Sequence, residues 1–232
     1  MKILALESSA VAASAALCED GACLGLYLQN CGLTHSETLL PMAENLLKGC
    51  GLTLGEVDLI AVARGPGSFT GVRIGVATAK GLSWGAEKPC CGVSTLEGMA
   101  WQAARLRGRL LCCCMDARRG QVYNALFRAE GERPRRISED RAIALSELLP
   151  ELTEPPVLLG DGAAITAAAM EKAGLPFELA PETLRLQTAW GVALAALHAP
   201  RETWGEPEPV YLRLSQAERE RLAKLEQDIN HT

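Results

Sequence analysis

The order of its apolar segments is the feature that most constrains how this chain folds. Two apolar runs flank Asp20-Gly21, which is a strong hairpin signal, and with the start of the chain they predict an antiparallel meander over 2–28. Helices and strands then alternate. The same order restarts at Arg109, where two more apolar runs flank the turn Asp116–Gly120. A hairpin-first pattern that occurs twice predicts two similar α/β halves rather than one doubly wound sheet.

The restart also sets the expected domain boundary. We predict a first half at residues 1–106 and a second, smaller half at 107–209. The segment 200–209 carries three prolines and is predicted to be a linker. Beyond it, 210–232 contains a charged helix that we expect to pack back on the first half.

Apolar periodicity and capping signals place the remaining elements. Thr34 with Glu37 and Ser94 with Glu97 match the capping box that opens a helix. The segments predicted as helices are 34–48, 72–84, 94–106, 146–149, 163–173 and 188–198. Those predicted as further strands are 57–63, 89–93 and 157–160.

Composition excludes several classes of protein. The net charge of −5 over 232 residues argues against a strong, autonomous nucleic-acid binder. No stretch approaches about 20 uninterrupted apolar residues, so no membrane span is expected. The nine cysteines include no Cys-x-x-Cys pair and two runs of neighbours, which favours reduced, apolar cysteines in a cytoplasmic protein.

The segment Gly65–Gly71 is rich in glycine and lies between a predicted strand and a predicted helix. Such a turn can present backbone N–H groups to an anion. However, Val72-Arg73 follows where a P-loop has Lys-Ser or Lys-Thr, and the glycine spacing does not match the Rossmann fingerprint. A tight structural turn and a phosphate site remain equal alternatives.

The helix after this loop has a face almost without side chains, formed by Gly71, Gly75, Ala79 and Ser83. Glycine inside a helix costs about 0.5–1 kcal/mol relative to alanine, so a close approach of another backbone is the expected compensation. The neighbour is either the protein's own sheet and first helix or a helix of another subunit.

Two further motifs remain ambiguous from sequence alone. The three histidines form no pair at metal-binding spacing, and no catalytic residue is predicted. Gly160-Asp161-Gly162 lies between a strand and a helix. It either approaches a nucleotide or is an ordinary turn with Asp161 as the helix cap.

Several longer strings resemble one known family. The string Gly65–Gly75 resembles the signature of the TsaB family, also called YeaZ. Further matches are Met115–Gly120, Gly160–Gly162 and Pro209–Arg213. The resemblance thus spans nearly the whole chain, and its first string is highly specific.

The resemblance implies the fold and the function. That family is similar to the actin/Hsp70/sugar-kinase superfamily, whose members have two ribonuclease-H-like halves. It implies an accessory, non-catalytic subunit for the transfer of threonylcarbamoyl to adenosine of tRNA, without a cofactor of its own. The implied partners are the catalytic paralogue TsaD and the ATPase TsaE in a ternary complex, with tRNA as an indirect partner and no membrane.

The resemblance to TsaD also implies a lost metal site. TsaD has His-Met-Glu-Gly-His where this chain has Thr95-Leu96-Glu97-Gly98-Met99. Thr95 and Met99 replace both histidines, and neither can hold a hard or borderline cation. At the first strand the family usually has Asp-Thr-Ser, whereas this chain has Glu7-Ser8-Ser9. These three residues and Asp161 are therefore only vestigial candidates for a nucleotide contact.

The two helices at 34–48 and 72–84 are predicted to meet TsaD, and to close a homodimer when TsaD is absent. The residues predicted for this interface are His35, Leu39, Met42, Leu46, Gly71, Val72, Gly75, Val76, Ala79 and Ser83. Arg118 and Arg119 lie on the second hairpin turn and are predicted to be exposed. They form either a solvated turn or a contact to tRNA phosphate or a partner carboxylate.

Two rival functions belong to other classes. The chain could be an ATP-dependent phosphotransferase of the same superfamily, with Glu7, Asp116 and Asp161 as candidate carboxylates. A metallopeptidase is disfavoured because the obvious metal ligands are missing.

Overall fold

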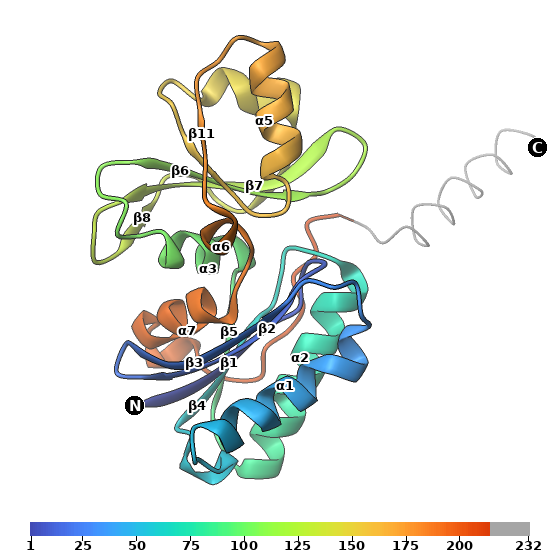
Figure 1. Cartoon of the computed structure of the whole chain (residues 1–232), viewed down its shortest axis with the longest axis vertical. Coiled ribbons are helices and arrows are strands. Elements are labelled where there is room, and N and C mark those ends of the chain that lie inside the picture. Colours follow the sequence, from blue (N-terminus) through green and yellow to red (C-terminus); the bar gives the residue numbers. More distant parts are fainter. Residues whose placement is uncertain (214–232) are drawn as a thin grey trace, which may run out of the picture.

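The computed structural model describes residues 1–213, and the predicted charged helix beyond Ser215 lies outside this part. Two β-sheets lie one above the other, separated by a pair of helices and flanked by further helices at both ends (Figure 1). This α/β architecture confirms the predicted fold class. Among residues 1–213, no helix combines the length and the hydropathy that a membrane span requires.

The first sheet has five strands in the order β3-β2-β1-β4-β5. Its elements are β1 (Lys2–Glu7), β2 (Ala13–Glu19), β3 (Ala22–Gln29), β4 (Leu59–Ala63), β5 (Cys90–Val93), α1 (His35–Gly49), α2 (Phe69–Ala86) and α3 (Thr95–Gln102). β1 pairs antiparallel with β2 and parallel with β4, so the predicted meander forms one side of the sheet. Asp20 and Gly21 make the hairpin turn with positive φ angles, as that two-residue turn requires.

The second sheet has the strand order β11-β10-β6-β7-β8, with β9 also paired to β7. The elements that follow α3 in the chain are β6 (Leu110–Asp116), β7 (Gln121–Ala129), β8 (Pro134–Arg136), β9 (Arg141–Ala144), α4 (Leu145–Leu148), β10 (Val157–Leu159), α5 (Ala163–Lys172), β11 (Glu178–Leu179), α6 (Glu182–Arg185) and α7 (Ala189–His198). Short 3₁₀ turns lie at 54–56, 149–151 and 201–203. The polar stretch 129–141 forms β8 and the start of β9, which periodicity did not predict, because short strands leave too little alternation to detect.

The halves meet through α3 and α7 (Figure 1). α7 packs on the first sheet, although its residues fall in the range predicted for the second half, and α3 packs on the second sheet. The two helices cross at Gly98 and Gly191. A Cβ at Gly191 would lie 2.1 Å from the carbonyl oxygen of Gly98, so the crossing requires glycine. Each half therefore has a helix that packs on the sheet of the other half. The domain boundary at residue 106 stays a prediction.

Local capping differs from the expectation at both predicted boxes. Thr34 precedes α1 but its side chain makes no capping hydrogen bond. At α3 the Ser94 hydroxyl accepts from the Glu97 N–H, while no reciprocal bond from the Glu97 side chain forms. The Glu97 carboxylate lies instead 3.4 Å from Arg136 of the second half. The Glu97 carboxylate therefore forms an ion pair with a residue distant in the sequence, and not the hydrogen bond of the capping box.

The bare face of α2 packs inside the chain. A Cβ at Gly71 would lie 2.1 Å from the Ser8 carbonyl oxygen, and one at Gly75 would lie 2.4 Å from the Ser8 hydroxyl. Ala79 is fully buried in the cluster between α1, α2 and the first sheet. The close neighbour is thus the end of β1, which is the first of the two alternatives that the sequence left open.

This contact generates a prediction for Gly71→Ala. The new methyl group would meet backbone, which cannot move as a flexible side chain does, so the folded state should lose about 1–3 kcal/mol or more. Gly81→Ala is the matched control in the same helix, because a Cβ added there would have no atom within 4 Å. It should stabilise the chain by about 0.5–1 kcal/mol through the helix propensity of alanine. Urea unfolding of both variants measures the difference, and equal stabilities would contradict the packing described.

Candidate functional site

A cleft of about 390 Å³ lies between the two halves at the end of β1. Its floor and walls come from the β1–β2 loop, the glycine-rich turn, the β6–β7 turn and the segment after residue 209. The lining residues are Ser9, Ala10, Val11, Gly67, Ser68, Phe69, Met115, Asp116, Ala117, Arg118, Tyr123, Asp161, Val210, Tyr211, Leu212 and Arg213. Segments far apart in the sequence therefore build one polar site.

Glu7 ends β1 beneath this cleft and is almost completely buried. Its carboxylate accepts a hydrogen bond of 2.6 Å from the Ser9 N–H. Burial raises the pKa of Glu7 to about 7, although the bonds from Ser9 act in the opposite direction. The Glu7 carboxylate is thus bonded to the backbone of its own chain, and Ser9 rather than Glu7 lines the cleft.

The glycine-rich turn lies against this strand end. Ser68 N–H donates to the Ser9 carbonyl at 2.7 Å, and Ser8 donates to the Gly71 carbonyl at 2.9 Å. The N–H groups of Gly71 and Val72 both donate to Ser68, to its hydroxyl and its carbonyl respectively. Three N–H groups of the turn are therefore already bonded within the chain, which favours the structural alternative over a phosphate site.

Asp161 faces the same cleft from the second half. It accepts a hydrogen bond of 2.7 Å from Gln187, and burial raises the pKa of its carboxyl group. Of the two alternatives for this turn, the one with Asp161 as the helix cap is wrong, because Gly162 occupies the cap position of α5 and no side chain caps the helix. Gln187, for which the sequence gave no signal, is the side-chain donor to Asp161.

Arg118 and Arg119 lie on the β6–β7 turn, and both are exposed as predicted. Both have positive φ angles, 65° and 57°, which residues other than glycine adopt rarely. The Arg118 guanidinium pairs with Asp116 at 3.1 Å, and the Arg118 backbone N–H donates to the same carboxylate at 2.7 Å. The turn therefore carries two exposed cations, and Arg118 is the one that lines the cleft.

The segment after residue 209 closes the cleft from one side. Val210 N–H donates to the Arg64 carbonyl at 2.7 Å. The Tyr211 ring lies 4.5 Å from that of Phe69, and the Tyr211 hydroxyl accepts from Arg73 at 2.8 Å. The sequence showed that this segment resembles a motif of the TsaB family, but it could not predict these contacts. The residues that they join are more than a hundred positions apart in the chain.

Thr95 and Met99 are both buried. Met99 packs in the core between α3 and the second sheet, and a Cβ at Gly160 would lie 2.9 Å from its sulfur. Thr95 has a hydroxyl without a hydrogen-bond partner. A thioether and a hydroxyl in these positions offer no imidazole to a metal. Within residues 1–213, no group of three or more His, Cys, Asp or Glu residues is arranged to hold a metal ion.

Most residues predicted for the partner interface belong to the core. Eight of the ten are buried against the first sheet: Leu39, Met42, Leu46, Gly71, Val72, Gly75, Val76 and Ala79. His35 donates to the Ala10 carbonyl at 2.7 Å, and Ser83 to the Lys88 carbonyl at 2.5 Å. The prediction of these side chains as a contact surface is corrected, because a periodic apolar face packs first on the chain's own sheet.

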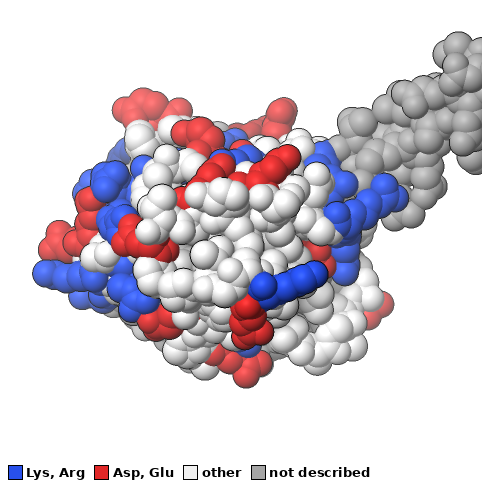
Figure 2. All heavy atoms as spheres, turned by 90° about the horizontal axis from the view of Figure 1, so that it is seen from above, with Lys and Arg blue, Asp and Glu red and all other residues white. Residues whose placement is uncertain are grey.

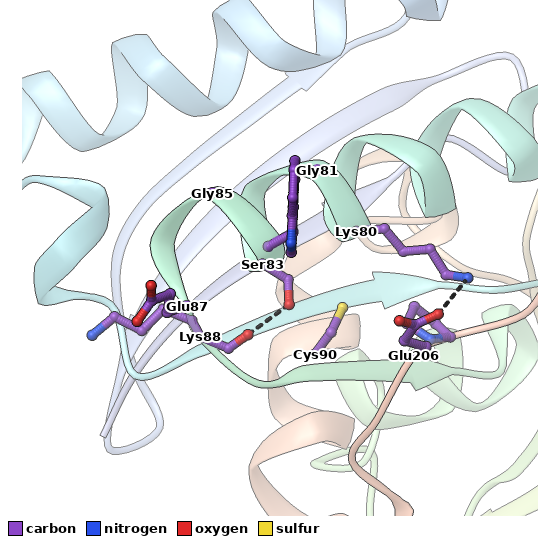
Figure 3. Close-up of a pocket in the computed structure, with 10 residues that line it drawn as sticks. Lys80, Gly81, Ser83, Gly85, Glu87, Lys88, Cys90 and Glu206 are labelled. Atoms are coloured by element: carbon purple, nitrogen blue, oxygen red, sulfur yellow. Dashed lines mark hydrogen bonds and ion pairs between the residues drawn. The ribbon is translucent and has the colours of Figure 1, made fainter.

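The outer face of the same helices has different residues. On α2 the small exposed residues are Ala77, Gly81 and Gly85, four positions apart. Trp84 beside them is 87% exposed, and Leu40 of α1 is 40% exposed. Trp84 and Gly81 also border a hollow of about 770 Å³, where Lys80 pairs with Glu206 (Figure 3).

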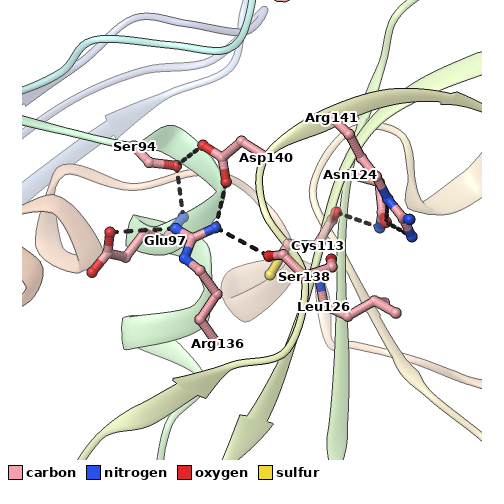
Figure 4. A network of polar contacts seen from close by, with 9 residues as sticks. All are labelled: Ser94, Glu97, Cys113, Asn124, Leu126, Arg136, Ser138, Asp140 and Arg141. Carbon is pink, nitrogen blue, oxygen red and sulfur yellow. Dashed lines mark hydrogen bonds and ion pairs between the residues drawn. The ribbon is translucent and has the colours of Figure 1, made fainter.

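A polar network fixes one half against the other (Figure 4). Ser94 donates to Asp140 at 2.5 Å, and Arg136 donates to the same carboxylate at 2.6 Å. Arg136 also faces Glu97 and lies 4.6 Å above the Phe127 ring. The first half thus contributes a serine and a glutamate to a cluster built on the second half.

Charges of both signs alternate around the molecule as seen from above. Figure 2 shows Lys and Arg interleaved with Asp and Glu around an uncharged centre. This face therefore lacks the continuous basic surface of an autonomous nucleic-acid binder.

Two α/β halves around a cleft, with β1 and a glycine-rich turn at its base, define a protein of the actin/Hsp70/sugar-kinase fold. The component A of (R)-2-hydroxyglutaryl-CoA dehydratase from Acidaminococcus fermentans shares this fold, with a TM-score of 0.51 over 88% of this chain and 99% of that one, at 12% identity. YeaZ from Pseudomonas aeruginosa has a TM-score of 0.75 and 27% identity over 91% of this chain and 99% of that one.

Sequence comparison gives the family. The family model of TsaD, tRNA N6-adenosine threonylcarbamoyltransferase, matches residues 29–219. The TsaB protein of Bacillus subtilis is 32% identical over 94% of this chain and 96% of its own length. The chain belongs to the TsaB family. The TsaB protein of Escherichia coli is 42% identical over 131 residues, so the match spans 56% of the length of each chain.

The burial of Glu7 generates a prediction for pH dependence. Its pKa of about 7 in the folded chain exceeds the ordinary 4.5, so the folded chain holds this proton more tightly than the unfolded chain does. The contribution of this proton to the free energy of unfolding is therefore fully present below pH 4.5. It is lost as the pH rises towards 7, and the loss amounts to about 3 kcal/mol at 1.36 kcal/mol per pKa unit. Glu7→Gln should remove this loss, whereas the exposed Glu44→Gln should retain it.

Urea midpoints between pH 5 and pH 7.5 measure the effect in the three proteins. Parallel pH profiles for the wild type and Glu7→Gln would show that Glu7 is ionised in the folded chain throughout this range.

Proposed function

We propose that this chain is a non-catalytic scaffold subunit in the biosynthesis of threonylcarbamoyladenosine in tRNA, and that it acts by binding TsaD. The observation that carries the proposal is the pair Thr95 and Met99. The helix that would present two metal ligands is retained, yet these positions hold a hydroxyl and a thioether, both buried. Relatives in the TsaB family are named as tRNA threonylcarbamoyladenosine biosynthesis proteins. The tRNA N6-adenosine threonylcarbamoyltransferase of Sphingopyxis alaskensis is 44% identical over 66 residues, which is 28% of this chain.

The outer face of α1 and α2 is proposed as the surface that meets TsaD. Its small residues Ala77 and Gly81 allow another backbone to approach, and Trp84 on α2 and Leu40 on α1 supply exposed apolar area. A related first half in TsaD makes a pseudo-twofold pairing of like with like geometrically natural. In the absence of TsaD, the same face is proposed to close a homodimer.

TsaE is proposed as the third member of the complex, and tRNA as a partner mainly through TsaD. The rival function, an ATP-dependent phosphotransferase, rests on Asp116 and Asp161, which both line the cleft. Turnover of ATP by this chain alone would favour that rival. The scaffold function is favoured if tRNA modification by TsaD and TsaE depends on this chain and the chain alone does not turn over ATP.

Gly81→Trp tests the proposed surface. A Cβ at this position would have no atom within 4 Å, so the fold should be retained while the bulky ring separates the two helix pairs. Overpacking of this kind costs about 1–3 kcal/mol, so TsaD should bind roughly ten- to a hundredfold more weakly. tRNA modification at limiting subunit concentration should fall in parallel.

Ala168→Trp on α5 is the matched control, because it places the same ring on an exposed helix position of the second half. Calorimetric titration with TsaD and thermal unfolding are measured for both variants. Undiminished TsaD binding by a folded Gly81→Trp chain would place the contact elsewhere.

Arg118 and Arg119 are proposed to contact tRNA phosphate or a partner carboxylate. Both are exposed on a turn whose backbone is held in the left-handed region, and Arg118 lines the cleft. Arg118→Ala with Arg119→Ala should lower complex-dependent modification several-fold, and the deficit should shrink at high salt, where the wild-type contact is screened. Arg133→Ala with Arg135→Ala controls for the loss of two exposed charges. Modification equal to the wild type at every salt concentration would leave the solvated turn as the explanation.

A further inference from the structure

The cleft between the halves is lined by one acid and one cation that lack a charged partner. Asp116 and Arg118 also line it, but they pair with each other at 3.1 Å. The side-chain donor to Asp161 is the neutral amide of Gln187, and Arg213 donates to a backbone carbonyl of the β6–β7 turn. Within residues 1–213, neither Asp161 nor Arg213 forms an ion pair. The cleft therefore offers one negative and one positive group to a ligand.

A buried hydroxyl in the same lining has no partner. Ser9 is 1% exposed, and its hydroxyl makes no hydrogen bond within the described chain. Buried polar groups of native proteins are normally bonded to protein or to water, so this hydroxyl marks a place for a polar group from outside the chain. An ammonium group has three N–H donors, enough for the Ser9 hydroxyl and the Asp161 carboxylate together.

The cleft offers less to a phosphate group or to a metal ion. The N–H groups of Ser68, Gly71 and Val72 in the glycine-rich turn are already bonded within the chain. A divalent cation such as Mg²⁺ takes about six oxygen ligands, whereas Asp161 is a single unpaired carboxylate. A small organic ligand that carries both charges uses the unpaired acid and the unpaired cation at once.

The size and the remaining lining suit such a ligand. The cleft volume of about 390 Å³ falls within the range of about 300–1,000 Å³ that is usual for small-molecule sites. Val11, Met115 and Leu212 add apolar side chains to the lining. The ring of Tyr211 is fixed beside them by its contacts with Phe69 and Arg73. The lining thus has room for an aliphatic side chain between charged ends.

We propose that this cleft binds a free α-amino acid as a zwitterion, with its ammonium group on Asp161 and Ser9 and its carboxylate on Arg213. The guanidinium of arginine binds a carboxylate through two parallel N–H donors, which fixes the orientation of the ligand. The three side chains come from the first half, the second half and the segment after residue 209, so the bound ligand joins all three. The inference uses this chain alone and does not rest on the proposed function.

Three probes separate the two charges of the ligand in calorimetric titrations of the full chain. L-leucine carries both charges, leucinamide lacks the carboxylate, and N-acetyl-L-leucine lacks the ammonium group. L-leucine should bind with a dissociation constant of about 1 mM or below. Each of the other two probes should bind at least about tenfold more weakly, because it leaves one charged group of the cleft without its partner.

Variants assign each charge to a residue. Asp161→Asn should abolish the preference for L-leucine over N-acetyl-L-leucine, and Arg213→Gln the preference over leucinamide. Ser9→Ala should weaken L-leucine binding several-fold. Glu171→Gln and Arg105→Gln remove exposed charges outside the cleft and should retain the wild-type affinity. Thermal unfolding checks that each variant is folded, and the three probes on the wild type decide the matter even for a variant that is not.

Three results would overturn the proposal. The first is no binding of L-leucine at millimolar concentration, and the second is equal binding of the three probes by the wild type. The third is L-leucine binding that folded Asp161→Asn and Arg213→Gln chains both retain. MgATP and MgCl₂ are titrated in parallel, and displacement of L-leucine by either of them at lower concentration would assign the cleft to a nucleotide or a metal ion instead.

Discussion

The contact between the end of β1 and the glycine-rich turn is the constraint on which the rest of the structure depends. Gly67 and Gly71 touch the backbone of Ser9 and Ser8 at distances that leave no room for a Cβ. The same contact sets the start of α2 and seats that helix beside β4. It also fixes the position of Ser9 in the lining of the cleft. The close packing of these two backbone segments therefore determines both the base of the site and the position of the outer face of α2.

The side chains at the base of the cleft are largely bonded within the chain or packed in its core. Glu7 is buried with a pKa of about 7 and bonds to the chain's own backbone. Asp161 is held by Gln187, and Met99 fills space in the core. The polar groups of Glu7 and Asp161 are thus bonded within the chain, and this accords with the scaffold role proposed above.

Contact with another subunit is proposed for the outer face of α1 and α2 in the first half. This face offers the small residues Ala77 and Gly81 and the exposed ring of Trp84. The inner face of the same helices packs on the first sheet, so its side chains are occupied within the chain.

The sequence by itself determined the element order, both hairpins and the family, because these depend on local periodicity, turn chemistry and residue identity. It predicted the exposure of Arg118 and Arg119 for the same reason. Only the tertiary structure decided that Gly71 and Gly75 face inward, that Gln187 binds Asp161, and that α7 packs on the first sheet. Spacing along a helix defines a face but not its neighbour, and that neighbour is set by contacts between residues far apart in the chain.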